Sequence, residues 1–280
     1  MFGISLFGVP LFAESSVLSA YVPTEEFTFN TYGLQNPGQY GIHISDFDIV
    51  SPTRDFKTTP VPGGHGLLLQ EDWFRENPIT LHGWISQTNR EQLENKIHEF
   101  MRNIHGQGGT LILKNGGTFK EIETTMQTVE FINPHYAITR KEFNVTFQGI
   151  KSFWRDNAYS SQSLFDEASL SIDGTMDNTG SVVADPIVIV IFSAATAVTG
   201  VSLTNTSTGE QVSISSAINS GDVVIFDSEQ KIVTVNGTEV EFSGVLPELI
   251  VGLNSYTIDV TGTSSTVDIT AKHKNNYLTP

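Results

Sequence analysis

Short runs of alternating apolar and polar residues, separated by turn residues, fill the chain from about residue 181 to residue 271. Asn236-Gly237 lies between two β-branched runs, and this dipeptide fits the positive φ angles of a two-residue hairpin turn. The continuous apolar run 187–192 follows Pro186, as expected for a strand buried inside a sandwich. Strands spaced about every ten residues predict a β-sandwich or jelly roll, and no part of this half has helical periodicity.

The first half mixes strands with one helix, which we predict over residues 89–105. Thr88 and Glu91 have the spacing of a capping box at its start, and Gly106 lies where a helix-ending glycine belongs. A single apolar stripe follows at helical spacing, formed by Leu93, Ile97, Phe100, Met101 and Ile104.

Several strands are also predicted in this half. Residues 25–30 place Phe27 and Phe29 on one face, and residues 40–50 read as a strand with an irregularity near its middle. Asn115-Gly116 predicts the turn of a hairpin. Residues 141–150 form a further strand with its aromatic residues on one face. Residues 59–66 contain two Pro and three Gly, so we expect a loop or an extended arm there.

Trp154 lies where this mixed pattern changes to the strand-and-turn pattern, and a polar, Ser-rich run follows it. We therefore expect a mainly β protein with an α+β N-terminal domain and a C-terminal β-sandwich. The expected bounds are 1–152 for the first domain, 153–170 for a linker, and 171–280 for the sandwich.

Charge and composition exclude several classes of function. The net charge is −16; residues 1–152 carry 11 basic and 16 acidic side chains, and residues 153–280 carry 4 and 15. Binding to phosphates requires clustered Lys and Arg, so sequence-specific nucleic-acid binding is not expected, and neither is adhesion to anionic membranes. The absence of Cys excludes disulfides and thiolate chemistry.

The N-terminal 15 residues are apolar, but the first basic residue of the chain is Arg54. A signal peptide needs a positive segment at its start, so we expect a β-arm here instead. No segment reaches 18 apolar residues, so a membrane-spanning helix is not expected.

A search for reactive or metal-binding patterns yields only weak candidates. His98 and His105 lie seven residues apart rather than one helical turn apart. Asp46 and Asp48 share one side of a strand, where carboxylates could share a proton or bind a cation. The other candidates are Asp173, Asp177 and Asn178, which fail the spacing of a calcium loop, and the glycines of 63–66, which lack a phosphate-binding lysine. We therefore predict no catalytic, cofactor or metal site, and no enzyme.

The order of these segments resembles the distal tail protein family of long non-contractile-tailed bacteriophages. The resemblance covers essentially the whole chain. It depends on the strand–helix–strand block 79–113, the aromatic junction at Phe153 and Trp154, and the ordered series NTSTGE, GDVVIFD, VTVNG and GLNSYTI in the second half.

The resemblance implies an N-terminal domain that assembles into a hexameric ring and a galectin-like C-terminal sandwich that projects outward. Such a virion protein, assembled in the host cytoplasm, is a hub between the tail tube protein and the tail-tip and receptor-binding components. DNA passes through its lumen, where acidic groups would repel phosphates. The apolar N-terminus and residues 58–64 are candidates for arms that reach a neighbouring subunit. The alternative is an extracellular carbohydrate-binding β-sandwich module, which usually needs an exposed aromatic platform.

Overall fold

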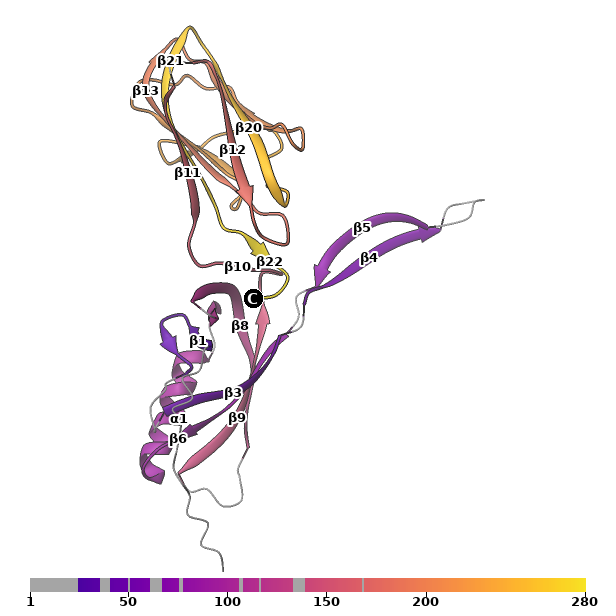
Figure 1. Ribbon diagram of the computed structural model, residues 1–280, viewed down its shortest axis with the longest axis vertical. Coiled ribbons are helices and arrows are strands. Elements are labelled where there is room, and N and C mark those ends of the chain that lie inside the picture. The colour runs from indigo at the N-terminus through magenta and orange to yellow at the C-terminus, as the bar shows by residue number, and fades with distance from the viewer. Residues whose placement is uncertain are drawn as a thin grey trace, which may run out of the picture.

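The computed structural model describes residues 25–35, 41–49, 51–60, 67–75, 78–105, 108–115, 117–132, 139–167 and 169–280. These residues are mainly in β-strands, which confirms the predicted fold class. Figure 1 shows two bodies stacked along the long axis: a sheet with one helix against it, and a β-sandwich. A single hairpin projects sideways from between them.

A nine-stranded antiparallel sheet forms the first body. Its main path follows the order β2-β1-β7-β8-β9-β6-β3; β10 pairs with β8, and β22 pairs with β10. The bounds are β1 (Glu25–Phe29), β2 (Tyr32–Gly33), β3 (Gly41–Ile49), β6 (Pro78–Ser86), β7 (Gly108–Asn115), β8 (Thr118–Ile132), β9 (Arg140–Gly149), β10 (Trp154–Asp156) and β22 (Asn276–Tyr277).

The sheet curls around an aromatic core. Phe27 of β1 and Phe47 of β3 stand near opposite ends of the strand order, yet their ring centroids lie 5.1 Å apart. Phe29 and Phe147 likewise lie 5.0 Å apart. The irregularity predicted within residues 40–50 is confirmed, because the pairing of β3 with β6 shifts register between Ile44 and Asp46.

The helix α1 (Arg90–Ile104) packs its apolar stripe into this core, as predicted. Its start differs from the prediction by one residue. Asn89 is the N-cap, and its side-chain oxygen accepts a hydrogen bond from the backbone N–H of Gln92 at 2.9 Å. The prediction of a capping box formed by Thr88 and Glu91 is therefore wrong, because Asn89 supplies an equally good capping oxygen one position later. Gly106 lies outside the described residues.

The hairpin of β7 and β8 also differs by one residue from the prediction. Asn115 pairs with Thr118 and is therefore the last residue of β7 rather than part of the turn, while Gly116 lies outside the described residues. Gly117, at φ 99°, adopts the positive angle that the prediction assigned one position earlier.

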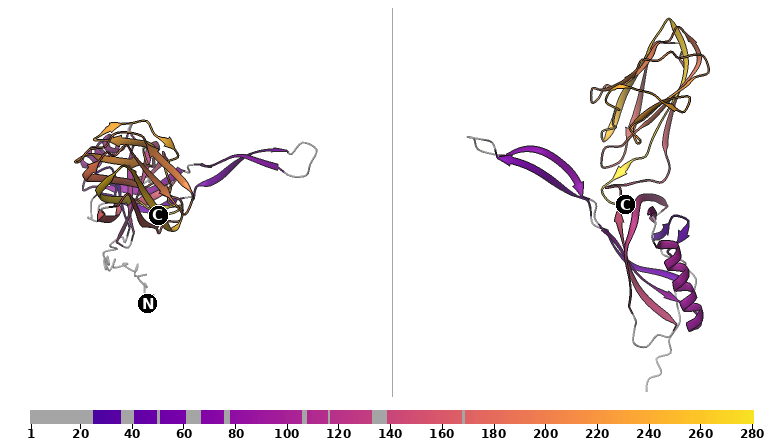
Figure 2. Two further views of the ribbon diagram at one scale, coloured as in Figure 1. Left: turned by 90° about the horizontal axis from the view of Figure 1, so that it is seen from above. Right: turned by 180° about the vertical axis from the view of Figure 1, so that it is seen from behind.

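A two-stranded hairpin, β4 (Thr53–Pro60) and β5 (Leu67–Arg75), extends away from both bodies (Figure 2). Thr59 and Pro60 end β4, so the loop expected at 59–66 begins two residues later than predicted. Residues 61–66 lie outside the described residues. The prediction did not anticipate the two long strands β4 and β5.

Two sheets make the C-terminal sandwich, in the orders β11-β21-β13-β16-β17-β18 and β12-β20-β14-β15-β19. The first contains β11 (Ser160–Glu167), β13 (Ile187–Thr196), β16 (Val223–Asp227), β17 (Ile232–Val235), β18 (Thr238–Glu239) and β21 (Ser264–His273). The second contains β12 (Ser171–Asn178), β14 (Gly200–Asn205), β15 (Glu210–Ile214), β19 (Ser243–Gly244) and β20 (Gly252–Thr261).

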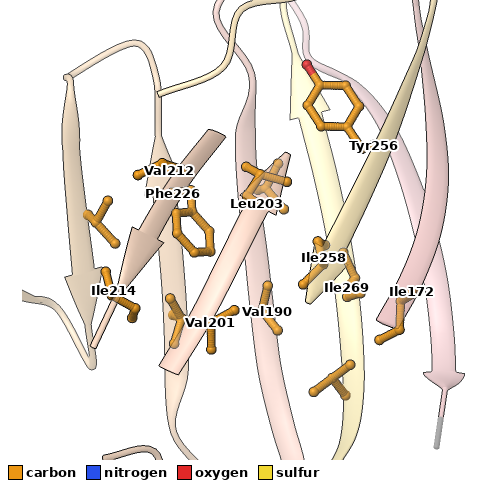
Figure 3. Close-up of a cluster of buried hydrophobic side chains, with 14 of the residues drawn as sticks. Ile172, Val190, Val201, Leu203, Val212, Ile214, Phe226, Tyr256, Ile258 and Ile269 are labelled. Atoms are coloured by element: carbon orange, nitrogen blue, oxygen red, sulfur yellow. The ribbon is translucent and has the colours of Figure 1, made fainter. Parts of the chain in front are cut away.

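Apolar side chains from both sheets meet between them, among them Val190, Leu203 and Phe226, all fully buried (Figure 3). The predicted hairpin turn is confirmed: Asn236 and Gly237 have φ angles of 52° and 76° between β17 and β18. In the sandwich, the residues of this turn were therefore enough to predict the position of the hairpin.

The segment 153–170, expected as a linker, contains two strands instead. β10 joins the first sheet, and β11 pairs with β21 at the edge of the sandwich. Ser160 to Ser163 are exposed, because β11 is an edge strand with one neighbour. A polar edge strand lacks the alternation of a half-buried strand, which is why its sequence resembled a linker.

Candidate functional site

The weak metal and catalytic candidates do not come together. In the described part of the chain, no three His, Asp or Glu side chains are placed to hold a metal ion. His98 and His105 are exposed on or beside α1. That the chain has no catalytic, cofactor or metal site remains a prediction.

Asp46 and Asp48 are exposed on β3, and Asp48 contacts a histidine. His82 Nε2 lies 3.2 Å from Asp48 Oδ2, and its Nδ1 lies 2.8 Å from Asn144 Oδ1. The hydrogen bond with Asn144 raises the pKa of His82, as do the hydrogen bond with Asp48 and the charges of both carboxylates, against an opposing effect of burial. This histidine bridges β3 and β9 across β6.

Asp173, Asp177 and Asn178 form strand rather than the Asp- and Gly-bearing turn that was expected. All three lie in β12, which pairs with β20. Asp173 accepts a hydrogen bond from Thr257 Oγ1 at 2.6 Å. Asn178 is buried and donates to the carbonyl oxygen of Leu249. The pleat points the side chains at 177 and 178 to opposite faces, so they do not converge as calcium ligands.

Trp154 lies at the joint between the two bodies and belongs to the first. Its side chain is 2% exposed and packs within the N-terminal core. Its strand partner is Tyr277, which packs against the same core. The chain therefore leaves the first sheet at β10, builds the sandwich, and returns to the first sheet at β22.

Arg155 is the centre of a charged network at this joint. Its Nε donates to Glu121 at 2.8 Å and its Nη2 to Glu123 at 3.0 Å, both on β8. Its Nη1 donates to Glu229, in the turn between β16 and β17 of the sandwich. Lys274 Nζ also lies 2.7 Å from the buried carboxylate of Glu121. These carboxylates raise the pKa of Arg155 against the effect of burial, so the guanidinium stays charged.

A cleft of about 220 Å³ opens beside this network, lined in part by Phe153, Arg155, Asp185 and Glu229. The root of the projecting hairpin meets the same segment. The rings of Phe74 and Phe153 lie 5.0 Å apart at 71°, an edge-to-face contact. The joint thus brings together the first sheet, the sandwich and the hairpin.

Sequence reasoning missed the roles of Arg155 and Glu229. Their one signal is composition, because Arg155 is one of only 4 basic residues after position 152. A lone Arg in a strongly acidic segment tends to be held by several carboxylates, but spacing along the chain could not identify which ones.

The tyrosines of the second half do not form an exposed platform. Tyr256 is 5% exposed and part of the sandwich core, while Tyr277 packs against the N-terminal core. Tyr159 is exposed, but its ring lies under Lys272 and Lys274. These positions do not favour the carbohydrate-binding alternative.

Comparison with known proteins connects the C-terminal half with one family. Residues 179–277 match the model of the siphovirus-type tail component, C-terminal domain. The match covers about a third of the chain, almost all of it in the C-terminal sandwich. For these residues, the match agrees with the resemblance to distal tail proteins seen in the sequence. No curated protein matches the chain in sequence.

A solved structure shares the fold of the chain. The Dit protein of phage SPP1, described as a paradigm of the hub adsorption apparatus in phages infecting Gram-positive bacteria, aligns with a TM-score of 0.69 at 11% identity. The alignment covers 90% of this chain and 98% of that one. The phage P2 baseplate in its activated conformation with Ca aligns at 0.48 and 8% identity, over 90% and 98%. Within the described residues, no helix has the length and apolar character needed to cross a membrane.

Proposed function

We propose that the protein is a siphovirus-type tail component and the structural hub of the tail tip, without enzymatic activity. Six copies form a ring that joins the tail tube protein to the tail-tip and receptor-binding components, and DNA passes through the central hole. The protein acts in the virion after assembly in the host cytoplasm. The observation that carries the proposal is the family match of residues 179–277, together with a fold shared with a hub protein along nearly its whole length.

We assign ring formation to residues 1–152 and outward display to the sandwich, residues 171–280. The hairpin of β4 and β5 supports this assignment. An isolated two-stranded hairpin is marginally stable in water, so one that extends away from its own body gains stability by packing on a neighbour. Its root is fixed on Phe153, so the arm leaves the molecule at a defined place. The apolar N-terminal residues are the second candidate arm.

The charge of the chain supports a role as a DNA conduit. The net charge is −16 for each copy and −5 for residues 1–152 (11 basic and 16 acidic side chains), so each copy repels phosphates on balance. We therefore expect no retention of duplex DNA by the purified protein, even at low ionic strength, where nonspecific binding is strongest.

Size-exclusion chromatography with light scattering tests the ring. The expected particle has six times the 30.7 kDa of one chain, either alone or after addition of tail tube protein. A chain that stays monomeric under both conditions would contradict the proposal. A variant lacking residues 54–74, with a short Gly-Ser loop in their place, should lose the ring and keep the sandwich folded.

A further inference from the structure

Apolar packing does not fix the angle between the two bodies. The hydrophobic cluster of the first sheet and that of the sandwich share no residue. The chain crosses the joint twice, once between β10 and β11 and once between β21 and β22. Such a joint would act as a hinge unless directional contacts held it. The polar contacts at the joint therefore determine whether the angle between the two bodies is fixed.

The first set of contacts is a continuous ladder of backbone hydrogen bonds. Asp156 of β10 donates its N–H to the carbonyl oxygen of Asn275 at 3.0 Å, and Ser181 donates to that of Asn276 at 2.8 Å. Val182 forms an antiparallel bridge with Asn276. Hydrogen bonding therefore runs from β8 through β10 and β22 into the segment that leads to β13.

Gly180 lets this ladder close. A Cβ atom at that position would lie 2.3 Å from the carbonyl oxygen of Asn276, inside any allowed contact. The side-chain oxygen of Asn178 also accepts the N–H of Gly180 at 2.9 Å. The close approach of these two backbone segments thus depends on the missing side chain.

The second set of contacts is ionic and lies beside the ladder. Arg155 binds Glu121 and Glu123 on the first sheet and Glu229 on the sandwich, so one guanidinium joins both bodies. Glu229 is presented by a turn that is itself well fixed. Ser228 Oγ donates to the carbonyl oxygen of Pro247 at 2.8 Å, and Gln230 N–H donates to Asp227 at 2.9 Å.

We propose that the ladder and the Arg155 network form a two-part clamp, which holds the sandwich at one fixed angle to the N-terminal sheet. The parts restrain different motions. The ladder restrains translation and twist along the two crossing strands. The ion pair with Glu229, from a turn outside those strands, restrains tilt. A clamp of this kind makes every copy present its sandwich in the same direction, and it requires no contact between copies.

The absence of Cys allows the clamp to be tested with two introduced labels. Asn95 on α1 and Glu241 in the sandwich are exposed. The variant Asn95→Cys/Glu241→Cys, spin-labelled in the full chain, should give one narrow distance distribution by pulsed electron resonance. Glu229→Ala should broaden it, and Gly180→Ala should broaden and shift it. Arg140→Ala is the control, because it removes an ion pair with Glu142 at the start of β9, the end of that strand away from β10, and should change nothing.

Two results would overturn the clamp: several distances or a broad distribution in the labelled parent, or an unchanged width in both Glu229→Ala and Gly180→Ala. Glu229 lies in a turn and its side chain is 26% exposed, so Glu229→Ala is expected to fold. It therefore still tests the clamp if Gly180→Ala fails to fold. Hydrogen exchange in β6 and β13 verifies that each variant remains folded before its distances are compared.

Discussion

The substitution Trp154→Ala tests whether the side chain at the joint stabilises the first body or the sandwich. The side chain is 2% exposed and lies within the N-terminal core. Truncation of a buried Trp to Ala costs about 3–5 kcal/mol, from lost burial and from the cavity left behind. A domain is typically stable by about 5–15 kcal/mol, so this loss removes a large share of the stability of the first body.

Hydrogen exchange followed by mass spectrometry resolves the two bodies. Amides that exchange only through unfolding of the N-terminal body, in β6 and β9, should exchange roughly a hundred- to several thousand-fold faster, since each 1.4 kcal/mol is about a factor of ten. Amides of β13 and β16 should be almost unaffected. Ile191→Ala, at a side chain 40% exposed, is the matched control and should change neither body appreciably. Faster exchange confined to the sandwich, or no change in β6 and β9, would refute the assignment.

Three further changes test local features of the first body. Asn89→Ala should lower the free energy of unfolding by about 1 kcal/mol, because it removes the helix cap, and Thr88→Ala should lower it clearly less. Equal losses in the two variants would contradict the observed cap. Gly83→Ala should break the pairing of β3 with β6, because the new Cβ would lie 2.2 Å from the carbonyl oxygen of His43; unchanged protection in β3 would argue against that register. Because the pKa of His82 is raised in the folded state, its protonated ring should stabilise the fold. This contribution is complete below about pH 6.5 and is lost as the pH rises through the folded-state pKa. The effect should be under about 1 kcal/mol, because the side chain is 34% exposed; His82→Asn should abolish it in pH-dependent unfolding, and an NMR titration of His82 at or below the usual pKa would contradict it.

The parts of the fold that depend on local chemistry could be predicted from the sequence. The Asn236-Gly237 turn fixes its hairpin by its own backbone angles, and the apolar stripe of α1 fixes which face is buried. The errors of one residue, at Thr88 and at Asn115, arise where two adjacent residues offer similar chemistry. At the helix start, Asn89 is the residue whose side chain accepts the N–H of Gln92. At Asn115 the register of β7 with β8 decides, and register is a property of the whole sheet.

The joint could not be predicted in the same way. β22 pairs with β10, more than a hundred residues earlier in the chain, and no local signal marks a two-residue strand. The Arg155 network depends on carboxylates from β8 and from a turn of the sandwich, which only the tertiary fold brings together. β11 was mistaken for a linker because an exposed edge strand needs no apolar alternation.

Electron microscopy of the purified protein in negative stain tests the hub most directly, alone and with the tail tube protein. We predict six-fold rings with an open central hole and six peripheral lobes at a constant radius. Single, unassociated particles in both samples, or closed assemblies without a hole, would contradict a ring that connects the tube to the tip and lets DNA through.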